Sequence, residues 1–515
     1  MSTGQLQTSA DQQTESVRGA GLIKWVERVG NKLPHPFMLF VYLIAILMIL
    51  TAVLSLFDVY AIDPVKNEEV HVKNLLSQEG IQWILPNIIK NFSGFLPLGS
   101  ILTLMLGVGL AEKVGLLETV IRKMSLRVNA KYASYMVAFI AFFSHIASDA
   151  TFVIMPPLGA LIFMAVGRNP IAGLLAAIAG VGSGFTANIL IVTTDVLLSG
   201  ISSEIAKGVD PNVTVSVLDN WFFMATSVIL LTGLIGLITD KFIEPRLGTY
   251  KGNRLNKLED VTPEQNKALK ATGIAALVFI IVLAALVVPA NGLLRDPKLG
   301  TIVPSPFISG IVPIILLFFL TVSITYGIKI GAIRKQNDLP AYLADPIKGM
   351  AGFIVLVFPL SQFVALFNWS NMGTFMALYI TDLLEKVHMT GAPVFIGLMF
   401  LSAFLCLFIA SGSAIWSLLA PVFVPMFMAL GYHPAFAQIA FRIADSSVIP
   451  FAIVSPFTPL LLKFLQEYKP EAKLGTYYSL ILPYPLVIFV CWTLLLVVWY
   501  FLGLPIGPGV YPKLG

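Results

Sequence analysis

The chain has 515 residues, of which 57% are hydrophobic and only 12% carry a formal charge, against roughly 25% charged residues in an average soluble domain. This composition excludes an ordinary soluble enzyme. The net charge of +5 does not indicate a nucleic-acid-binding surface, because the basic residues cluster beside apolar runs, where Lys and Arg orient membrane spans. Those runs are long enough to cross a hydrocarbon core of about 30 Å as helices. The sequence therefore predicts an all-α polytopic membrane protein in a lipid bilayer.

A polar segment, residues 1–35, precedes the first apolar run. The first two spans are predicted at about 36–57 and 91–111, and the distance of the first from the start of the chain favours a retained helix over a cleaved signal peptide. Basic residues precede the first span and follow the second, whereas acidic residues predominate between them. Because Lys and Arg favour the cytoplasmic side, this pattern predicts a cytoplasmic amino terminus.

The next uncharged stretch, residues 132–167, is predicted to be a re-entrant helical hairpin. It is interrupted only by Asp149, which lies in a polar string, and it is flanked by Lys131 and Arg168. Two basic ends favour the same side of the membrane. Each limb would be about 25 Å long at 1.5 Å per residue, which is slightly short for a crossing. Asp149 is therefore expected at the tip of the hairpin.

Further apolar spans follow, and the charges between them alternate as a multi-pass topology requires. The basic segments 241–270 and 329–348 are expected on the cytoplasmic side. The predicted spans lie at about 170–199, 220–239, 271–294, 301–328 and 349–381.

A second hairpin is predicted at 389–432, because this uncharged run is too long for one helix and Ala410-Ser411-Gly412-Ser413 interrupts it. Two spans follow at about 435–462 and 478–502, before a tail at 503–515. The chain is thus expected to form about nine transmembrane helices and two re-entrant hairpins. This arrangement places the carboxyl terminus outside.

The two hairpins resemble each other and are expected to enter from opposite faces, which indicates an inverted repeat of residues 36–240 and 271–502. Each hairpin is followed by a span with a polar interruption, at 182–188 and 442–447. Together with the two hairpin tips, these interruptions make four breaks. Kinks and small-residue packing would explain one of them but explain all four poorly. Inverted repeats with broken helices are typical of secondary transporters, in which half-helix ends near the midplane face substrate and ions.

Four charged residues, Asp149, Asp195, Arg442 and Asp445, lie well inside apolar runs. Each costs about 2.5–3.5 kcal/mol at a helix centre, so each should face a partner or water. A carboxylate without water takes up a proton or holds a cation, so the three aspartates are candidates for coupling to H⁺ or Na⁺. A bound Na⁺ would lie near Asp195 or Asp445, and the sequence indicates no other metal. Arg442 and Asp445 are three apart and could instead neutralise each other. Asp195 could also lie at the membrane interface.

Two further side chains are candidates for substrate contact. Trp416 follows the second hairpin tip, where its ring could stack on a flat substrate, although most Trp residues in such chains are interface anchors. Asn368 lies in the polar interruption 368–371, where it could bind substrate or satisfy a kink. Cys406 and Cys491 both lie in apolar runs and indicate neither a disulfide nor a metal site.

Several motifs match a known family. They are Gly184-Phe185-Thr186-Ala187-Asn188, Thr193-Thr194-Asp195, Phe367-Asn368-Trp369-Ser370-Asn371, Ala420-Pro421-Val422-Phe423-Val424-Pro425-Met426-Phe427 and Arg442-Ile443-Ala444-Asp445-Ser446-Ser447. Their order and separation resemble the p-aminobenzoyl-glutamate transporter (AbgT) family over essentially the whole chain. The resemblance implies a homodimer in the inner membrane of a bacterium. Members of this family are linked to uptake of p-aminobenzoyl-glutamate, a folate breakdown product, and to ion-driven efflux of p-aminobenzoate-like sulfonamides.

The resemblance also implies functional roles for particular residues, namely Asp195, Ser413, Trp416, Pro434, Arg442 and Asp445. The chain departs from the family pattern at three places. The usual Asn before the second tip is Cys406, the usual Lys before the tryptophan is Ile415, and the segment 448–456 differs. Because an amide and a cation near the site are lost, the sequence does not decide whether the substrate carries a glutamate group. Transport itself is expected.

The sequence therefore predicts an ion-gradient-driven secondary transporter of small aromatic or carboxylate compounds, such as p-aminobenzoyl-glutamate, p-aminobenzoate or sulfonamides. Substrate contacts are expected from Asn188, Asn368, Ser413, Trp416, Pro434 and Arg442. A Na⁺-coupled transporter of dicarboxylates or other organic anions is an alternative. An anion channel is disfavoured, because no pore-lining ring of charges or filter repeat is visible. An enzyme is disfavoured because the chain contains no His-Glu-x-x-His, no Gly-x-Ser-x-Gly and no Gly-Lys of a phosphate loop.

Overall fold

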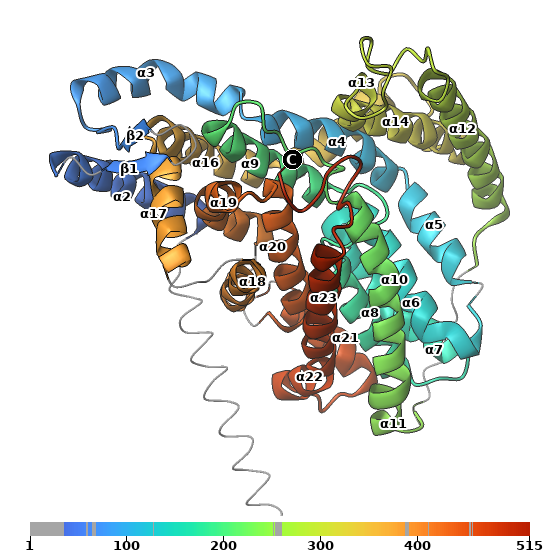
Figure 1. Ribbon diagram of the computed structural model, residues 1–515. Helices are drawn as coiled ribbons and strands as arrows, with labels where there is room; N and C mark the ends of the chain where they lie inside the picture. The colour runs from blue at the N-terminus through green and yellow to red at the C-terminus, as the bar shows by residue number, and fades with distance from the viewer. Residues whose placement is uncertain are drawn as a thin grey trace, which may run out of the picture.

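The computed structural model describes residues 35–57, 60–63, 68–126, 128–250, 252, 260–386, 391–409, 411–452, 455 and 457–514. The protein is helical, as predicted, with about 75% of residues in helices. Within the described ranges the one sheet is a hairpin of β1 (Tyr60–Asp63) and β2 (Glu68–His71), paired antiparallel with Tyr60 opposite His71. Figure 1 shows the helices packed side by side around a central group formed by both halves of the chain.

The first half contains a helical hairpin followed by a broken helix. The hairpin consists of α6 (Ala133–Ser144), a 3-10 turn (His145–Ala150) and α7 (Thr151–Ala165). The broken helix consists of α8 (Pro170–Gly184) and α9 (Thr193–Val209). The other helices are α2 (Pro36–Leu56), α3 (Gln78–Ser93), α4 (Leu96–Lys113), α5 (Leu116–Ser125), α10 (Trp221–Ile238) and α11 (Glu244–Leu247), the last two joined by a π-helical turn (Thr239–Ile243).

The second half repeats this order. Its hairpin consists of α18 (Ala392–Cys406) and α19 (Gly412–Ala429), and its broken helix of α20 (Pro434–Val448), a 3-10 turn (Ile449–Phe451) and α21 (Thr458–Tyr468). The other helices are α12 (Pro263–Val287), α13 (Pro306–Ser309), α14 (Ile311–Ile330), α15 (Asp338–Gly349), α16 (Ala351–Trp369), α17 (Met372–Lys386), α22 (Leu474–Ile481) and α23 (Pro483–Phe501).

Eight helical segments among the described residues are long and apolar enough to cross a membrane. One of them is α19, a limb of the second hairpin, and the others correspond to predicted spans. The two remaining predicted spans, 170–199 and 435–462, are the broken helices, in which neither half has the length of a full crossing. The first break overlaps the predicted interruption 182–188, since α8 ends at Gly184. The second prediction was wrong in position: residues 442–447 are helical within α20, and the chain leaves the helix only at the 3-10 turn Ile449–Phe451, where Pro450 lacks an amide N–H.

Several predicted span boundaries were wrong, among them those of the span predicted at 271–294, which is Pro263–Val287. The span predicted at 91–111 is α4, and a separate helix that was not predicted, α3, precedes it: the Ser77 hydroxyl accepts a hydrogen bond from the Gly80 amide at 3.1 Å and starts this helix at Gln78. The segment 349–381 is two helices, since Asn371 takes a left-handed conformation with φ of 59° between α16 and α17. The span predicted to begin at 301 begins at Ile311.

Close backbone contact holds the first hairpin against the broken helix behind it. A Cβ atom added to Gly173 of α8 would overlap the carbonyl oxygen of Gly159 in α7, and one added to Gly159 would lie 2.5 Å from the carbonyl oxygen of Gly173. Small residues at both positions let two membrane helices approach closely. The hairpin limbs are 12 and 15 residues long, and the turn between them lies inside the protein, since His145, Ile146 and Ala147 are buried.

Candidate functional site

A cavity of about 620 Å³ lies where both hairpin tips and both broken helices meet. Ala147 and Ala150 line it from the first tip, and Ser411, Gly412 and Ser413 from the second. The helix breaks contribute Phe185, Thr193 and Thr194 from the first half and Ile449, Ala452, Ser455 and Phe457 from the second. The structure thus brings together four segments that sequence patterns single out, although they lie as much as about 300 residues apart.

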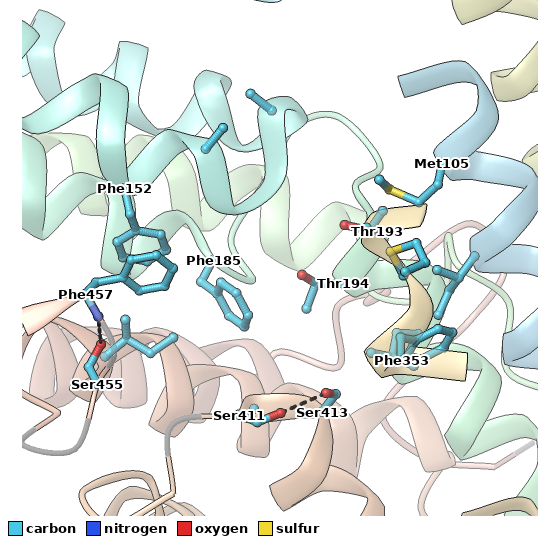
Figure 2. Close-up of a pocket in the computed structure, with 18 of the residues that line it drawn as sticks. Met105, Phe152, Phe185, Thr193, Thr194, Phe353, Ser411, Ser413, Ser455 and Phe457 are labelled. Atoms are coloured by element: carbon cyan, nitrogen blue, oxygen red, sulfur yellow. Dashed lines mark hydrogen bonds between the residues drawn. The ribbon is translucent and has the colours of Figure 1, made fainter. Parts of the chain in front are cut away.

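The walls of the cavity combine aromatic rings with hydroxyl groups (Figure 2). Phe152 and Phe457 stack with ring centroids 4.4 Å apart and planes at 7°. Phe185 lies beside them, Met105 and Phe353 lie on the opposite side, and hydroxyls project between the two groups. The Ser411 and Ser413 hydroxyl oxygens are 3.1 Å apart. Flat apolar walls with a few convergent polar groups suit a small aromatic ligand that carries polar substituents.

Asp445 is a buried acid in the wall of this cavity. It lies on α20, its residue exposure is 2%, and the Cys406 thiol donates to its Oδ1 at 3.3 Å. Its Oδ2 has no hydrogen-bond partner within the described part of the chain. A Cβ atom on Gly412 would lie 2.6 Å from Oδ2, so the absence of a side chain there lets the second tip rest on the carboxylate. Gly412 also begins α19, whose amino-terminal dipole favours a negative charge.

A second acid, Asp195, forms a buried ion pair with Arg442. The Arg442 Nη1 donates to Asp195 Oδ1 at 2.5 Å, and the two side chains are 1% and 10% exposed. The Val192 amide donates to Asp195 Oδ2 at 2.8 Å. Arg442 therefore pairs with Asp195 and not, as one alternative had it, with Asp445. Asp195 is buried in this pair rather than placed at the membrane interface. The pair joins the two broken helices beside the cavity rather than in its wall.

Asn188 lies next to this ion pair. With Asp195, Asn220 and Arg442 it lines a small void of about 10 Å³, near the space that one water molecule occupies. Among the described residues, neither its amide nitrogen nor its amide oxygen has a hydrogen-bond partner. Asn188 is thus close to the charges but does not line the large cavity.

The remaining predicted residues divide into two groups. Ser413 lines the cavity, and Asp149 lies in the turn of the first hairpin, although its side chain falls outside the described part of the structure. Asn368 and Pro434 do not line the cavity: the Asn368 amide donates to the Glu204 carbonyl oxygen at 3.2 Å, and Pro434 is a residue of the first turn of α20.

Trp416 differs most from its prediction. It is fully buried, its indole N–H donates to the Ser202 hydroxyl at 3.0 Å, and its ring stacks on Phe441 with centroids 5.0 Å apart. The residue faces the protein core between α19, α9 and α20 rather than the cavity. Its position just after the hairpin tip gave no information about which way the ring points.

Trp416→Phe is expected to lower the free energy of unfolding by about 1 kcal/mol, because it removes the hydrogen bond to Ser202 but keeps an aromatic ring against Phe441. The Kd of an aromatic ligand should not change. Thermal unfolding and ligand titration on the same detergent-solubilised sample measure both quantities. A weaker Kd at unchanged stability would place Trp416 in the substrate site.

Several cavity residues were not singled out from the sequence. Phe185 and Thr194 belong to the family motifs at 184–188 and 193–195. By contrast, nothing in the local sequence separates Phe152, Phe457 or Lys113 from other residues of the same type. Phe457 and Phe152 come together only because the second helix break folds against the first hairpin.

A helical membrane protein in which two hairpins and two broken helices surround a cavity has the architecture of a secondary transporter. The chain belongs to the AbgT putative transporter family, whose model matches residues 21–514.

Comparisons with individual proteins agree with this assignment. The p-aminobenzoyl-glutamate transport protein of Escherichia coli (strain K12) is 65% identical over 499 residues, which cover 97% of this chain and 98% of that protein. The YdaH transporter of Alcanivorax borkumensis has a TM-score of 0.87 and 37% identity, covering 92% of this chain and 100% of its own. MtrF of Neisseria gonorrhoeae, described among antimetabolite efflux pumps, has a TM-score of 0.89 and 37% identity, covering 95% and 100%.

Proposed function

We propose that the protein is an ion-coupled secondary transporter that moves p-aminobenzoyl-glutamate and related aromatic carboxylates or sulfonamides through the cavity between the hairpin tips. One observation carries this proposal: the buried carboxylate of Asp445 has an oxygen without a hydrogen-bond partner among the described residues. It lies in the wall of a cavity formed by both hairpin tips and both broken helices. Such a group is stabilised when it takes up a cation. Ion binding there would change the contact between Asp445 and the second hairpin tip, and hence the access of substrate.

The substrate class follows from the walls and from the relatives. Stacked phenylalanines and serine and threonine hydroxyls suit an aminobenzoyl ring with its polar substituents. The 65% identical relative is named for p-aminobenzoyl-glutamate, and MtrF is described among efflux pumps for antimetabolites. p-Aminobenzoyl-glutamate and sulfonamides such as sulfanilamide both contain a para-substituted aminobenzene ring, so one cavity can hold either class of compound. The replacement Ile415 is fully buried and does not line the cavity.

The immediate surroundings of Asp445 favour a proton as the coupling ion. Its one side-chain hydrogen-bond partner in the described structure is the Cys406 thiol, which is a soft donor, whereas small hard cations are held by several oxygen ligands. Asp195 is already neutralised by Arg442. We therefore assign the coupling role to Asp445 and a structural role to Asp195.

Other features are proposed on the same basis. The protein is proposed to act as a homodimer in the bacterial inner membrane, as the family resemblance implies. Its amino terminus is proposed to lie in the cytoplasm, because basic residues cluster in the corresponding segments. The described lining of the cavity contains one basic side chain rather than a ring of them, whereas anion-selective pores are lined by rings of Arg or Lys, so an anion channel is disfavoured.

Purified protein in proteoliposomes tests the proposal. A proton gradient of about one pH unit should drive accumulation of labelled p-aminobenzoyl-glutamate up to about tenfold for one coupled proton, since ~1.4 kcal/mol corresponds to a factor of ten. A Na⁺ gradient of equal size should drive none. Accumulation driven by the Na⁺ gradient alone would show that Na⁺, and not the proton, is the coupling ion. Downhill flux that neither gradient can drive uphill would contradict secondary active transport.

A further inference from the structure

The cavity has an uneven distribution of charge. Its described lining contains three acids, Glu112, Asp345 and Asp445, and one basic side chain, Lys113. Arg442 does not line it and is already paired with Asp195. A substrate that carries a carboxylate therefore meets one cation in this cavity.

Lys113 lies at the open end of the cavity. It is the last residue of α4, and Met105 of the same helix lines the cavity eight residues earlier, which is about 12 Å along a helix. The Lys113 side chain is 45% exposed. A substrate with its ring between Met105 and Phe185 thus has room to extend a charged group toward Lys113.

The present partner of Lys113 is easily exchanged. Its ammonium nitrogen is 3.8 Å from Asp345 Oδ2, and the Asp345 side chain is 46% exposed. Exposed ion pairs at this separation contribute little to the free energy of folding, so Lys113 can leave Asp345 at small cost. Asp345 also accepts a hydrogen bond from Lys348 at 3.0 Å, and this contact lowers the pKa of the Asp345 carboxyl. Asp345 would therefore remain ionised and paired if Lys113 turned away from it.

We propose that Lys113 binds the carboxylate of an anionic substrate at the open end of the cavity, in exchange for Asp345, and so determines the preference for carboxylates over uncharged aromatic compounds. This proposal rests on the function proposed above. The basic pattern of the sequence places this end of α4 at the cytoplasmic side, so Lys113 acts where substrate enters from or leaves to the cytoplasm.

Calorimetric titration of the purified full-length protein tests this role with two ligands, p-aminobenzoyl-glutamate and the uncharged sulfanilamide. Lys113→Gln should weaken binding of the anion about tenfold or more, as expected for loss of a charge-assisted hydrogen bond, and leave sulfanilamide within about twofold. Lys113→Arg should retain most of the affinity for the anion. Asp345→Asn should strengthen anion binding, because it removes the competing carboxylate.

The matched control is Lys329→Gln, an exposed lysine in the last turn of α14 that does not line the cavity; it should change neither affinity. Equal weakening of both ligands in Lys113→Gln, or unchanged binding of the anion, would overturn the role of Lys113 while leaving the proposed function intact. If the wild-type protein binds neither ligand, the proposed function fails and this inference fails with it.

Discussion

Arg442→Met is expected to lower the free energy of unfolding by about 3–5 kcal/mol, the range found when one partner of a buried ion pair is removed. The Asp195 carboxylate, whose side chain is 10% exposed, would be left without its counter-charge. Because the pair joins the two broken helices, the loss should also abolish transport. Yield in detergent, elution on size exclusion and thermal unfolding would record the change.

The double variant Asp195→Asn/Arg442→Met removes both charges and should recover most of the lost stability. Arg122→Gln is a suitable control, because its partner Glu118 is 56% exposed and exposed pairs contribute at most about 1 kcal/mol. An Arg442→Met protein as stable as the wild type, or a double variant as unstable as the single one, would contradict the ion pair seen here.

Asp445→Asn is expected to abolish gradient-driven accumulation, so that the ratio of internal to external substrate falls from about tenfold to about one under a gradient of one pH unit. The amide has nearly the same size and still fits beneath Gly412, but it cannot take up or release a proton. Binding and exchange of substrate across the membrane should persist. Uptake and counterflow in proteoliposomes separate the two activities.

Glu264→Gln is the matched control, since this exposed acid lies in the first turn of α12 and does not line the cavity. It should accumulate substrate like the wild type. Full accumulation by Asp445→Asn would remove Asp445 from coupling. Loss of substrate binding in the same variant would instead make Asp445 a substrate contact.

The helical architecture was predictable because it depends on local properties. Uncharged runs and their basic flanks indicate spans and hairpins, and Gly, Ser and Asn residues indicate the second hairpin tip and the first helix break. The second helix break follows the predicted residues 442–447, which are helical, and begins at Ile449–Phe451. Boundaries failed where one residue decided the outcome, as at Asn371, whose left-handed conformation ends α16, and at Ser77, whose hydroxyl starts α3. Neither effect is visible in hydropathy.

The site was predictable only as a set of segments. That Arg442 pairs with Asp195, 247 residues away, rather than with Asp445 one helical turn away follows from how the two halves pack. The direction of a side chain in a fully apolar helix is equally hidden, so Trp416 was expected in the cavity and is in the core. Lys113 is one of the basic residues that follow the second predicted span, where the sequence indicates only topology. Its place in the cavity lining depends on α4 lying beside the hairpins.

The central claim is that substrate binds between the hairpin tips and the helix breaks. Electron cryo-microscopy of the full-length protein with p-aminobenzoyl-glutamate tests it most directly. We expect density for the aromatic ring among Phe185, Thr194 and Ser413, with the glutamate portion directed toward Lys113. Ligand density elsewhere, with this cavity unchanged from the ligand-free protein, would contradict the account.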